Sequence, residues 1–239
     1  MIYKTRGIAI RTVKYKNSGL IAHIYTEEFG IQHYLVQGLH KTKSKIKDNL
    51  FRGLQLLDLE VYHRNTNKLE RIREVSLAHL QHNNAHDISK SSILLFLNEV
   101  LYKVLKSQEA DPALFKFIYN SILWLETKEK KYSDFHLVFL MKLSRLLGFG
   151  PTPSVSPHYF DLRLGIFTSW MPPHPDFSDG SLTAYFNQLI TTNYQEVHTL
   201  GYSKTVRLQL LELLLKFYHL HIDNFGEVKS LNILKDVFE

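Results

Sequence analysis

The residues with the clearest chemical potential form a run of alternating lysines. Lysine recurs at every second position of the run, at Lys41, Lys43, Lys45 and Lys47. Side chains spaced in this way point to both sides of an extended loop and can follow a phosphate backbone. Each phosphate that an ammonium group neutralises releases counterions, so the affinity falls with salt and ignores base sequence. The run therefore predicts contact with a nucleic acid.

The charge of the whole chain supports this prediction, because its surplus lies in the first third. Residues 1–80 hold 14 lysines and arginines against 7 aspartates and glutamates, whereas the other 159 residues hold 15 against 16, for a net charge of +6. A basic segment joined to a neutral one suggests two domains with separate tasks. Besides the lysine run, the basic segment offers six candidate DNA-binding cations: Arg11, Lys14, Lys16, Arg64, Lys68 and Arg71.

Aromatic residues are interleaved with these cations and have two possible uses. Tyr15, Tyr25, Phe29, Tyr34 and Tyr62 can stack on unpaired bases or fill the core of a small barrel. The spacing alone does not separate the two uses, and about half of these rings are expected in the core.

Two further clusters have ligand-type side chains but a weaker pattern. His82 and His86 have the spacing of a metal pair on a helix, with His79 just before, yet polar linker residues lie between them. A second cluster, in a proline-rich stretch, suggests a metal-dependent hydrolase as an alternative; it contains His158, Asp161, His174 and Asp176.

Signatures of catalysis are missing from the sequence. The chain has no cysteine, which excludes disulfides, thiol catalysis and cysteine-ligated zinc. It also has no G-x-S-x-G, P-loop or G-x-G-x-x-G pattern. We therefore expect a protein that is not an enzyme and holds neither a cofactor nor a metal.

The elements that must position these residues change in character along the chain. Five short β-branched segments separated by turn residues predict a closed five-stranded barrel of the OB-fold type; they span residues 7–13, 20–26, 31–37, 54–63 and 68–75. After Asp87 the apolar residues follow a helical period. Helices are predicted after Asp87 or Ser89, after Asp111-Pro112 and after Asp134, and then over 179–191 and 204–222.

These patterns predict an α+β chain of two domains. Residues 1–82 form the OB-fold domain, and residues 83–239 form a mainly α-helical domain with a proline-rich insertion at 151–177. Tyr159–Leu162 and Ile166–Ser169 within the insertion are expected to pair as a hairpin. The chain start lacks the apolar stretch of a signal peptide, and no segment is apolar enough to span a membrane, so a cytoplasmic protein is expected.

The order of several short motifs resembles the RecO family of bacterial DNA repair and recombination mediators. Residues 6–21 resemble the first hairpin of that family, and residues 25–30 and 38–44 resemble its next turn and basic loop. Leu146–Pro151 resembles the helix end before the family's central insertion, and Ser203–Arg207 with the following leucines and His219 resembles its last long helix. The resemblance spans the whole chain in register.

The resemblance implies an N-terminal OB-fold and a helical domain that bind single- and double-stranded DNA and anneal complementary strands. It also implies docking on the acidic C-terminal tail of single-stranded DNA-binding protein, and loading of RecA together with RecR. Candidate cations for the docked tail lie on the helices; they are Lys142, Arg145, Lys204 and Arg207. The family's nucleoid-associated, cytoplasmic location follows from the same resemblance.

One departure from the family and one alternative remain. Many members carry a four-cysteine zinc site after the Gly-Phe-Gly-Pro segment, whereas residues 151–177 occupy that place here without a cysteine. The alternative is a nucleic-acid-binding regulator, which would show a marked preference for sequence or structure.

Overall fold

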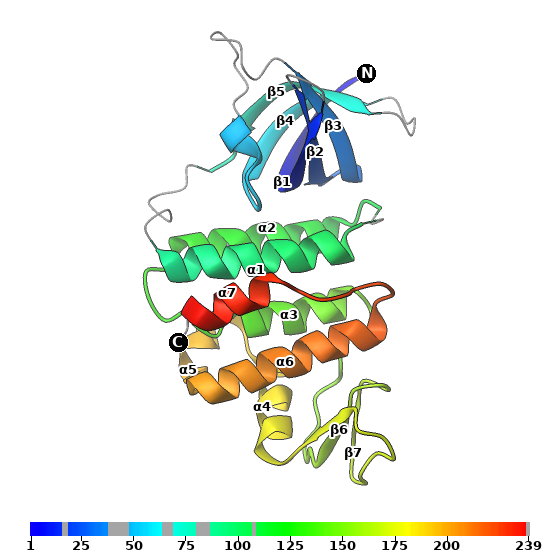
Figure 1. Cartoon of the computed structure of the whole chain (residues 1–239), viewed down its shortest axis with the longest axis vertical. Coiled ribbons are helices and arrows are strands. Elements are labelled where there is room, and N and C mark those ends of the chain that lie inside the picture. Colours follow the sequence, from blue (N-terminus) through cyan, green and yellow to red (C-terminus); the bar gives the residue numbers. More distant parts are fainter. Residues whose placement is uncertain (16–18, 38–47, 64–68, 80–86, 107–108, 238–239) are drawn as a thin grey trace. The chain divides into compact units, whose positions relative to one another are not determined.

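The computed structural model describes residues 1–15, 19–37, 48–63, 69–79, 87–106 and 109–237. The chain divides into two compact units, Met1–Glu126 and Thr127–Glu239, which are described separately below. Figure 1 shows the elements of both units coloured along the sequence.

The first unit contains the predicted closed barrel. Its strands run in the order β1-β2-β3-β5-β4, and every pairing is antiparallel except the short parallel contact of β3 with β5 (Figure 1). The strands are β1 (Ile2–Tyr15), β2 (Gly19–Thr26), β3 (Gly30–Gln37), β4 (Leu56–Tyr62) and β5 (Glu70–Leu77), with a 3-10 turn η1 (Asp48–Phe51) before β4. The OB-fold prediction is thus confirmed.

The barrel interior is filled by alternate residues of the strands. Leu20, Ala22 and Ile24 of β2 point inward together with Leu57 and Leu59 of β4. Gly7 of β1 lies so close to this core that a Cβ atom there would sit 2.6 Å from Leu59 Cδ1. Alternation of this kind leaves the intervening side chains on the outer face of the sheet.

Part of that outer face is covered by two helices of the same unit, α1 (Ile88–Val104) and α2 (Pro112–Thr127). Asp87 caps α1 by accepting a hydrogen bond from the Lys90 amide at 3.0 Å, as the sequence predicts. Tyr25 of β2 is fully buried, although it is not in the barrel core, and its ring lies 5.9 Å from that of Phe115 of α2. The barrel and these helices therefore share one apolar layer.

The domain boundary predicted between residues 82 and 83 lies in the segment 80–86, outside the described residues. The two compact units divide at Glu126, and α1 and α2 belong to the unit that contains the barrel.

The second unit is built on helices and a small sheet. Its helices are α3 (Phe135–Leu146), α4 (Gly180–Thr191), α5 (Val197–Leu200), α6 (Lys204–His221) and α7 (Ser230–Val237), with a 3-10 turn η3 (Tyr194–Glu196). The long helix α6 buries Leu210, Leu214 and Phe217. Tyr218 of the same helix donates a hydrogen bond of 2.7 Å from its hydroxyl to the carbonyl oxygen of Leu140 in α3. Helix α6 is therefore part of the core of the second unit.

The proline-rich insertion forms the predicted hairpin and one strand more. Strands β6 (Tyr159–Asp161) and β7 (Ile166–Thr168) pair antiparallel, and β8 (Phe177–Asp179) pairs with the other edge of β6. Phe160 of β6 is fully buried and packs on Phe186 and Phe217, with ring centroids 4.5 and 5.5 Å away. The insertion is therefore part of the core of the second unit.

Candidate nucleic-acid interface

Three of the predicted DNA-binding cations lie in the described part of the chain. Arg11 and Lys14 are exposed on β1, and Arg71 is exposed on β5. The other seven predicted cations lie outside the described residues; they are Lys16, Lys41, Lys43, Lys45, Lys47, Arg64 and Lys68.

Strand register sets Arg11 in a row with two histidines. Arg11 of β1 lies opposite His23 of β2, and His23 lies opposite His33 of β3. The two imidazole rings meet edge to face with centroids 4.3 Å apart. A β-bulge between Ala9 and Arg11 shifts the pairing of β1 by one residue and so fixes which β1 side chain joins this row.

Arg11 also contacts the helix that covers this side of the barrel. Its guanidinium donates a hydrogen bond of 2.8 Å to the hydroxyl of Tyr102 in α1 and lies 5.0 Å from the centre of that ring. Contacts of this kind hold a cation in place while leaving its remaining N–H donors available. The row of Arg11, His23 and His33 is thus joined to an aromatic side chain 91 residues away in sequence.

The electrostatics of this row follow from its burial. Partial burial, together with the neighbouring His33 and Arg11, lowers the pKa of His23 to about 4. His23 is therefore neutral at pH 7, and Arg11 carries the positive charge of the row.

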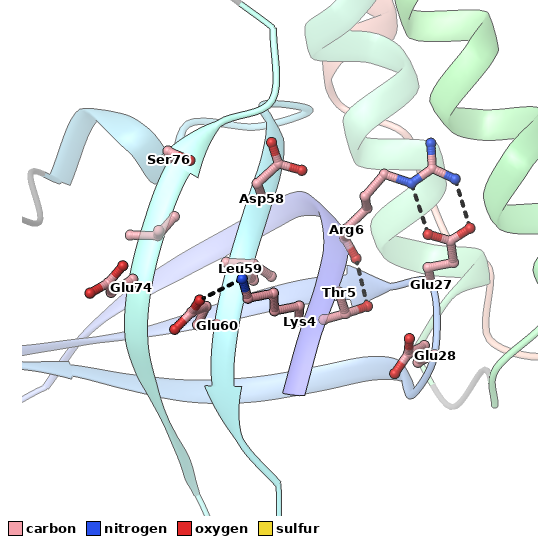
Figure 2. A pocket seen from close by; sticks show the side chains of 11 residues that line it. Lys4, Thr5, Arg6, Glu27, Glu28, Asp58, Leu59, Glu60, Glu74 and Ser76 are labelled. Carbon is pink, nitrogen blue, oxygen red and sulfur yellow. Dashed lines mark hydrogen bonds and ion pairs between the residues drawn. The ribbon is translucent and has the colours of Figure 1, made fainter. Parts of the chain in front are cut away.

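Another side of the barrel is acidic. A cavity there has a volume of about 460 Å³. Five carboxylates line it, as Figure 2 shows: Glu27, Glu28, Asp58, Glu60 and Glu74. Arg6 is held in it by two hydrogen bonds to Glu27, at 2.8 and 2.7 Å, and Lys4 pairs with Glu60 at 3.3 Å. The guanidinium of Arg6 lowers the pKa of Glu27, so this carboxylate keeps its negative charge. A phosphate would be repelled from this cavity.

The histidine and aspartate cluster of the insertion serves the fold. Asp161 contacts His174, with 3.2 Å between Oδ2 and Nε2, and its other oxygen accepts from the amides of Arg163 and Leu164. Asp176 pairs with Arg163 at 2.6 Å and with Lys216 at 2.8 Å, and these cations lower its pKa to about 2. The carboxylates thus close the β6–β7 turn and tie it to α6.

Metal ligation has little support in the described residues. Within them, no three His, Asp or Glu side chains gather closely enough to hold a metal ion. His82 and His86, the predicted histidine pair, both lie outside the described residues.

Among the described residues, no helix has the length and apolarity needed to cross a bilayer.

Comparison with known proteins assigns the family. The family model described as Recombination protein O N terminal matches residues 1–81, and that described as Recombination protein O C terminal matches residues 85–231. A DNA repair protein RecO from Azobacteroides pseudotrichonymphae genomovar. CFP2 is 37% identical over 245 residues and aligns over 100% of both chains. The chain belongs to the RecO family.

Two further relatives extend this result. The DNA repair proteins RecO of Bacteroides fragilis (strain YCH46) and Flavobacterium psychrophilum are 35% and 32% identical to this chain, again over 100% of both chains. RecO family membership gives the chain a role in DNA repair and recombination, and it confirms the resemblance seen in the sequence motifs.

The four cations predicted to bind a partner of this RecO chain differ in their surroundings. Arg145 and Lys204 are exposed, and Lys142 is half-buried with its Nζ 3.2 Å from the Asn193 side-chain oxygen. Arg207 instead lies in the interior: it pairs with the buried Asp134 at 2.6 Å and also donates to the carbonyl of Tyr202. Burial raises the pKa of Asp134, and Arg207 opposes that rise.

Proposed function

We propose that this chain is a recombination mediator that binds single- and double-stranded DNA without sequence specificity and anneals complementary strands. One observation carries the proposal: in this RecO family chain, the segment that forms the closed OB-type barrel also contains the chain's whole surplus of positive charge. OB-folds bind oligonucleotides on a cationic, aromatic surface. Neutralising two strands at once promotes their pairing and needs no catalytic residue.

The same barrel suggests where DNA runs. The acidic cavity of Figure 2 repels phosphates, so the path is expected to follow the side of Arg11. The lysine run Lys41–Lys47 is proposed to bind phosphates as well. Lys14 and Arg71 are exposed and offer further phosphate contacts.

We further propose that the second unit docks the acidic tail of single-stranded DNA-binding protein, and that the chain acts with RecR to load RecA in the bacterial cytoplasm. Arg145, Lys204 and Lys142 are the cations proposed for the tail, together with Arg207, which also pairs with Asp134. Binding of a fluorescent acidic peptide with apolar C-terminal residues tests this. Equal affinity of the wild type and a variant with Arg145→Ala and Lys204→Ala would contradict the assignment.

The DNA-binding proposal is tested with two matched triple variants. Lys43→Ala, Lys45→Ala and Lys47→Ala remove three charges from the lysine run, and Lys128→Ala, Lys130→Ala and Lys131→Ala remove three exposed charges from the second unit. Binding of a fluorescent mixed-sequence single strand is followed over a salt series, with annealing of its complement in parallel.

We expect the first triple to reduce the slope of log K against log salt by about two units, since single strands release about 0.7 counterions per contacted phosphate. The control triple should leave the slope unchanged. Equal slopes for both triples would contradict the assignment of the lysine run. A strong preference for one strand sequence would favour the regulator instead.

A further inference from the structure

A small cavity lies where the Arg11–His23–His33 row meets the end of α1. Its volume is about 290 Å³, and all of its lining residues belong to the first unit. Its deepest side chains are Ile10 of β1 and Leu105 just after α1, which are 2% and 1% exposed. Ligand pockets in proteins start at roughly 300 Å³, so this cavity is sized for one small group.

Three of the seven described side chains that line this cavity are flat rings. Tyr102 of α1 lines it, as do His23 and His33 from neighbouring strands. Because burial keeps His23 neutral at pH 7, its ring offers both a hydrogen-bond donor and an acceptor. Flat faces combined with neutral polar edges suit another flat heteroaromatic ring.

The rim of this cavity is cationic. Lys106 lines it and is exposed, and Arg11 reaches it through the 2.8 Å hydrogen bond to Tyr102. None of the described residues that line the cavity is a carboxylate, in contrast with the acidic cavity of Figure 2. A cationic ligand therefore finds no counter-charge here, whereas a phosphate finds two cations.

We propose that this cavity binds one unpaired nucleobase of a DNA strand, with the base against Tyr102 and the histidines and the adjoining phosphates on Arg11 and Lys106. The inference rests on the proposed DNA binding and adds a specific site to it. A base within a duplex cannot enter, because its faces are stacked and its edge is paired. The cavity thus favours single strands, whereas the lysine run contacts any phosphate backbone.

The test uses a cavity variant and a matched aromatic control. Tyr102→Leu removes the tyrosine ring from the cavity wall, and Tyr62→Leu removes an exposed ring of β4 that does not line the cavity. His33→Ser is a second cavity variant. Because His33 is exposed, this change should not disturb the fold, so it tests the cavity even if Tyr102→Leu does not fold. Affinity is measured for a mixed-sequence single strand, the same length of abasic strand, a duplex, and free deoxyadenosine monophosphate.

We expect Tyr102→Leu to weaken single-strand binding about tenfold, the effect of one lost base stack. Its affinity for the abasic strand and the duplex should change less than twofold, and Tyr62→Leu should resemble the wild type on every ligand. Equal losses on all strands would overturn the inference, since Tyr102 would then act only through Arg11. Binding of the free nucleotide with no loss on the single strand would also overturn it.

The two proposals fail in distinguishable ways. A wild-type chain that binds no strand at low salt contradicts the DNA-binding function itself. A wild-type chain that binds strands with a steep salt dependence, but whose Tyr102→Leu and Tyr62→Leu variants bind equally well, contradicts only the base-binding cavity.

Discussion

At the scale of single residues, the cations of the barrel differ in whether a carboxylate pairs with them. Arg6 and Lys4 are paired with Glu27 and Glu60, whereas Arg11 contacts the ring and hydroxyl of Tyr102. A count of charges along the sequence treats these cations as equivalent. The structure shows that Arg6 is engaged by a carboxylate and that Arg11 retains its full charge toward a ligand.

A buried histidine makes the stability of the second unit depend on pH. Burial, and then the charge of Arg207, lower the pKa of His136 in α3 to about 3. The unfolded chain binds this proton near pH 6.5 and the folded chain does not, so stability is complete above pH 6.5 and falls as the pH drops toward the folded pKa. Between pH 6.5 and 5.5 the loss from this one group is about 1 kcal/mol.

We expect His136→Gln to remove that part of the pH dependence. Urea unfolding at pH 7.5, 6.5 and 5.5 should show a shallower decline for the variant, whatever its stability at pH 7.5. His198→Gln changes an exposed histidine and should keep the wild-type slope. Identical slopes for all three proteins would show that His136 has the same pKa in the folded and unfolded chain.

At the scale of elements, the segment after α3 is shaped by two glycines. Gly148 has φ 88° and ends the helix, and the amide of Phe149 donates to the carbonyl of Ser144 at 3.1 Å. Gly150 then passes so close to α3 that an added Cβ would lie 2.6 Å from both N and Cα of Arg145. Backbone atoms of a helix cannot move aside for such a contact.

Gly150→Ala is therefore expected to destabilise the second unit by about 2 kcal/mol, the usual effect of overpacking. For a chain of this size the loss corresponds to a fall in Tm of roughly 4–8 °C. Gly148→Asn is the matched control, because the space beside Gly148 is open and asparagine tolerates a positive φ. Thermal unfolding followed by circular dichroism measures both variants, and equal Tm values would contradict the close approach.

The long, periodic elements are the ones that the sequence predicts well. Strands β2–β5 and helices α1, α2, α3, α4 and α6 lie within a few residues of their predicted bounds, whereas β1 begins at Ile2, well before its predicted start at Gly7. The sequence analysis did not predict β8, α5 and α7, which have 3, 4 and 8 residues. Such short elements carry too little periodicity to be recognised and are stabilised by tertiary packing.

The candidate site is predicted less completely. The basic character of the barrel is visible in the composition, but the role of His23, His33 and Tyr102 is not. Placing Arg11 beside His23 requires the register of the β1–β2 hairpin and the bulge in β1, and Tyr102 joins them only through tertiary packing. The predicted strands alternate correctly around His23, so the turn between β2 and β3 would have predicted the pairing of His23 with His33.

At the scale of the whole molecule, the barrel does not bury all of its apolar surface by itself. Ile8, Ile10 and Tyr25 are at most 2% exposed, yet they lie outside the barrel core. Phe115 of α2 covers Tyr25, and Arg6 lies over the ring of Tyr119 of the same helix at 4.8 Å. The folding unit is therefore expected to extend to Glu126, beyond the match to the N-terminal family model at residue 81.

Two fragments test this expectation. Residues 1–126 should unfold in one cooperative transition in urea, whereas residues 1–82 expose the side chains named above and should bind an apolar dye and aggregate. Measurements of dye fluorescence and of the urea midpoint compare the two fragments with the full chain. A fragment 1–82 that is soluble, binds no dye and has the same midpoint would place the boundary where the sequence analysis predicts it.

The ion pairs of Asp176 determine which cellular conditions can disturb the insertion. Asp176 ties β8 to Arg163 and to Lys216 of α6 by ion pairs, and the chain has no thiol. A cross-link of this kind neither draws on the supply of a trace metal nor is destroyed by peroxide, both of which threaten a zinc–thiolate cluster. These ion pairs are therefore expected to persist at peroxide concentrations that would oxidise a zinc–thiolate cluster.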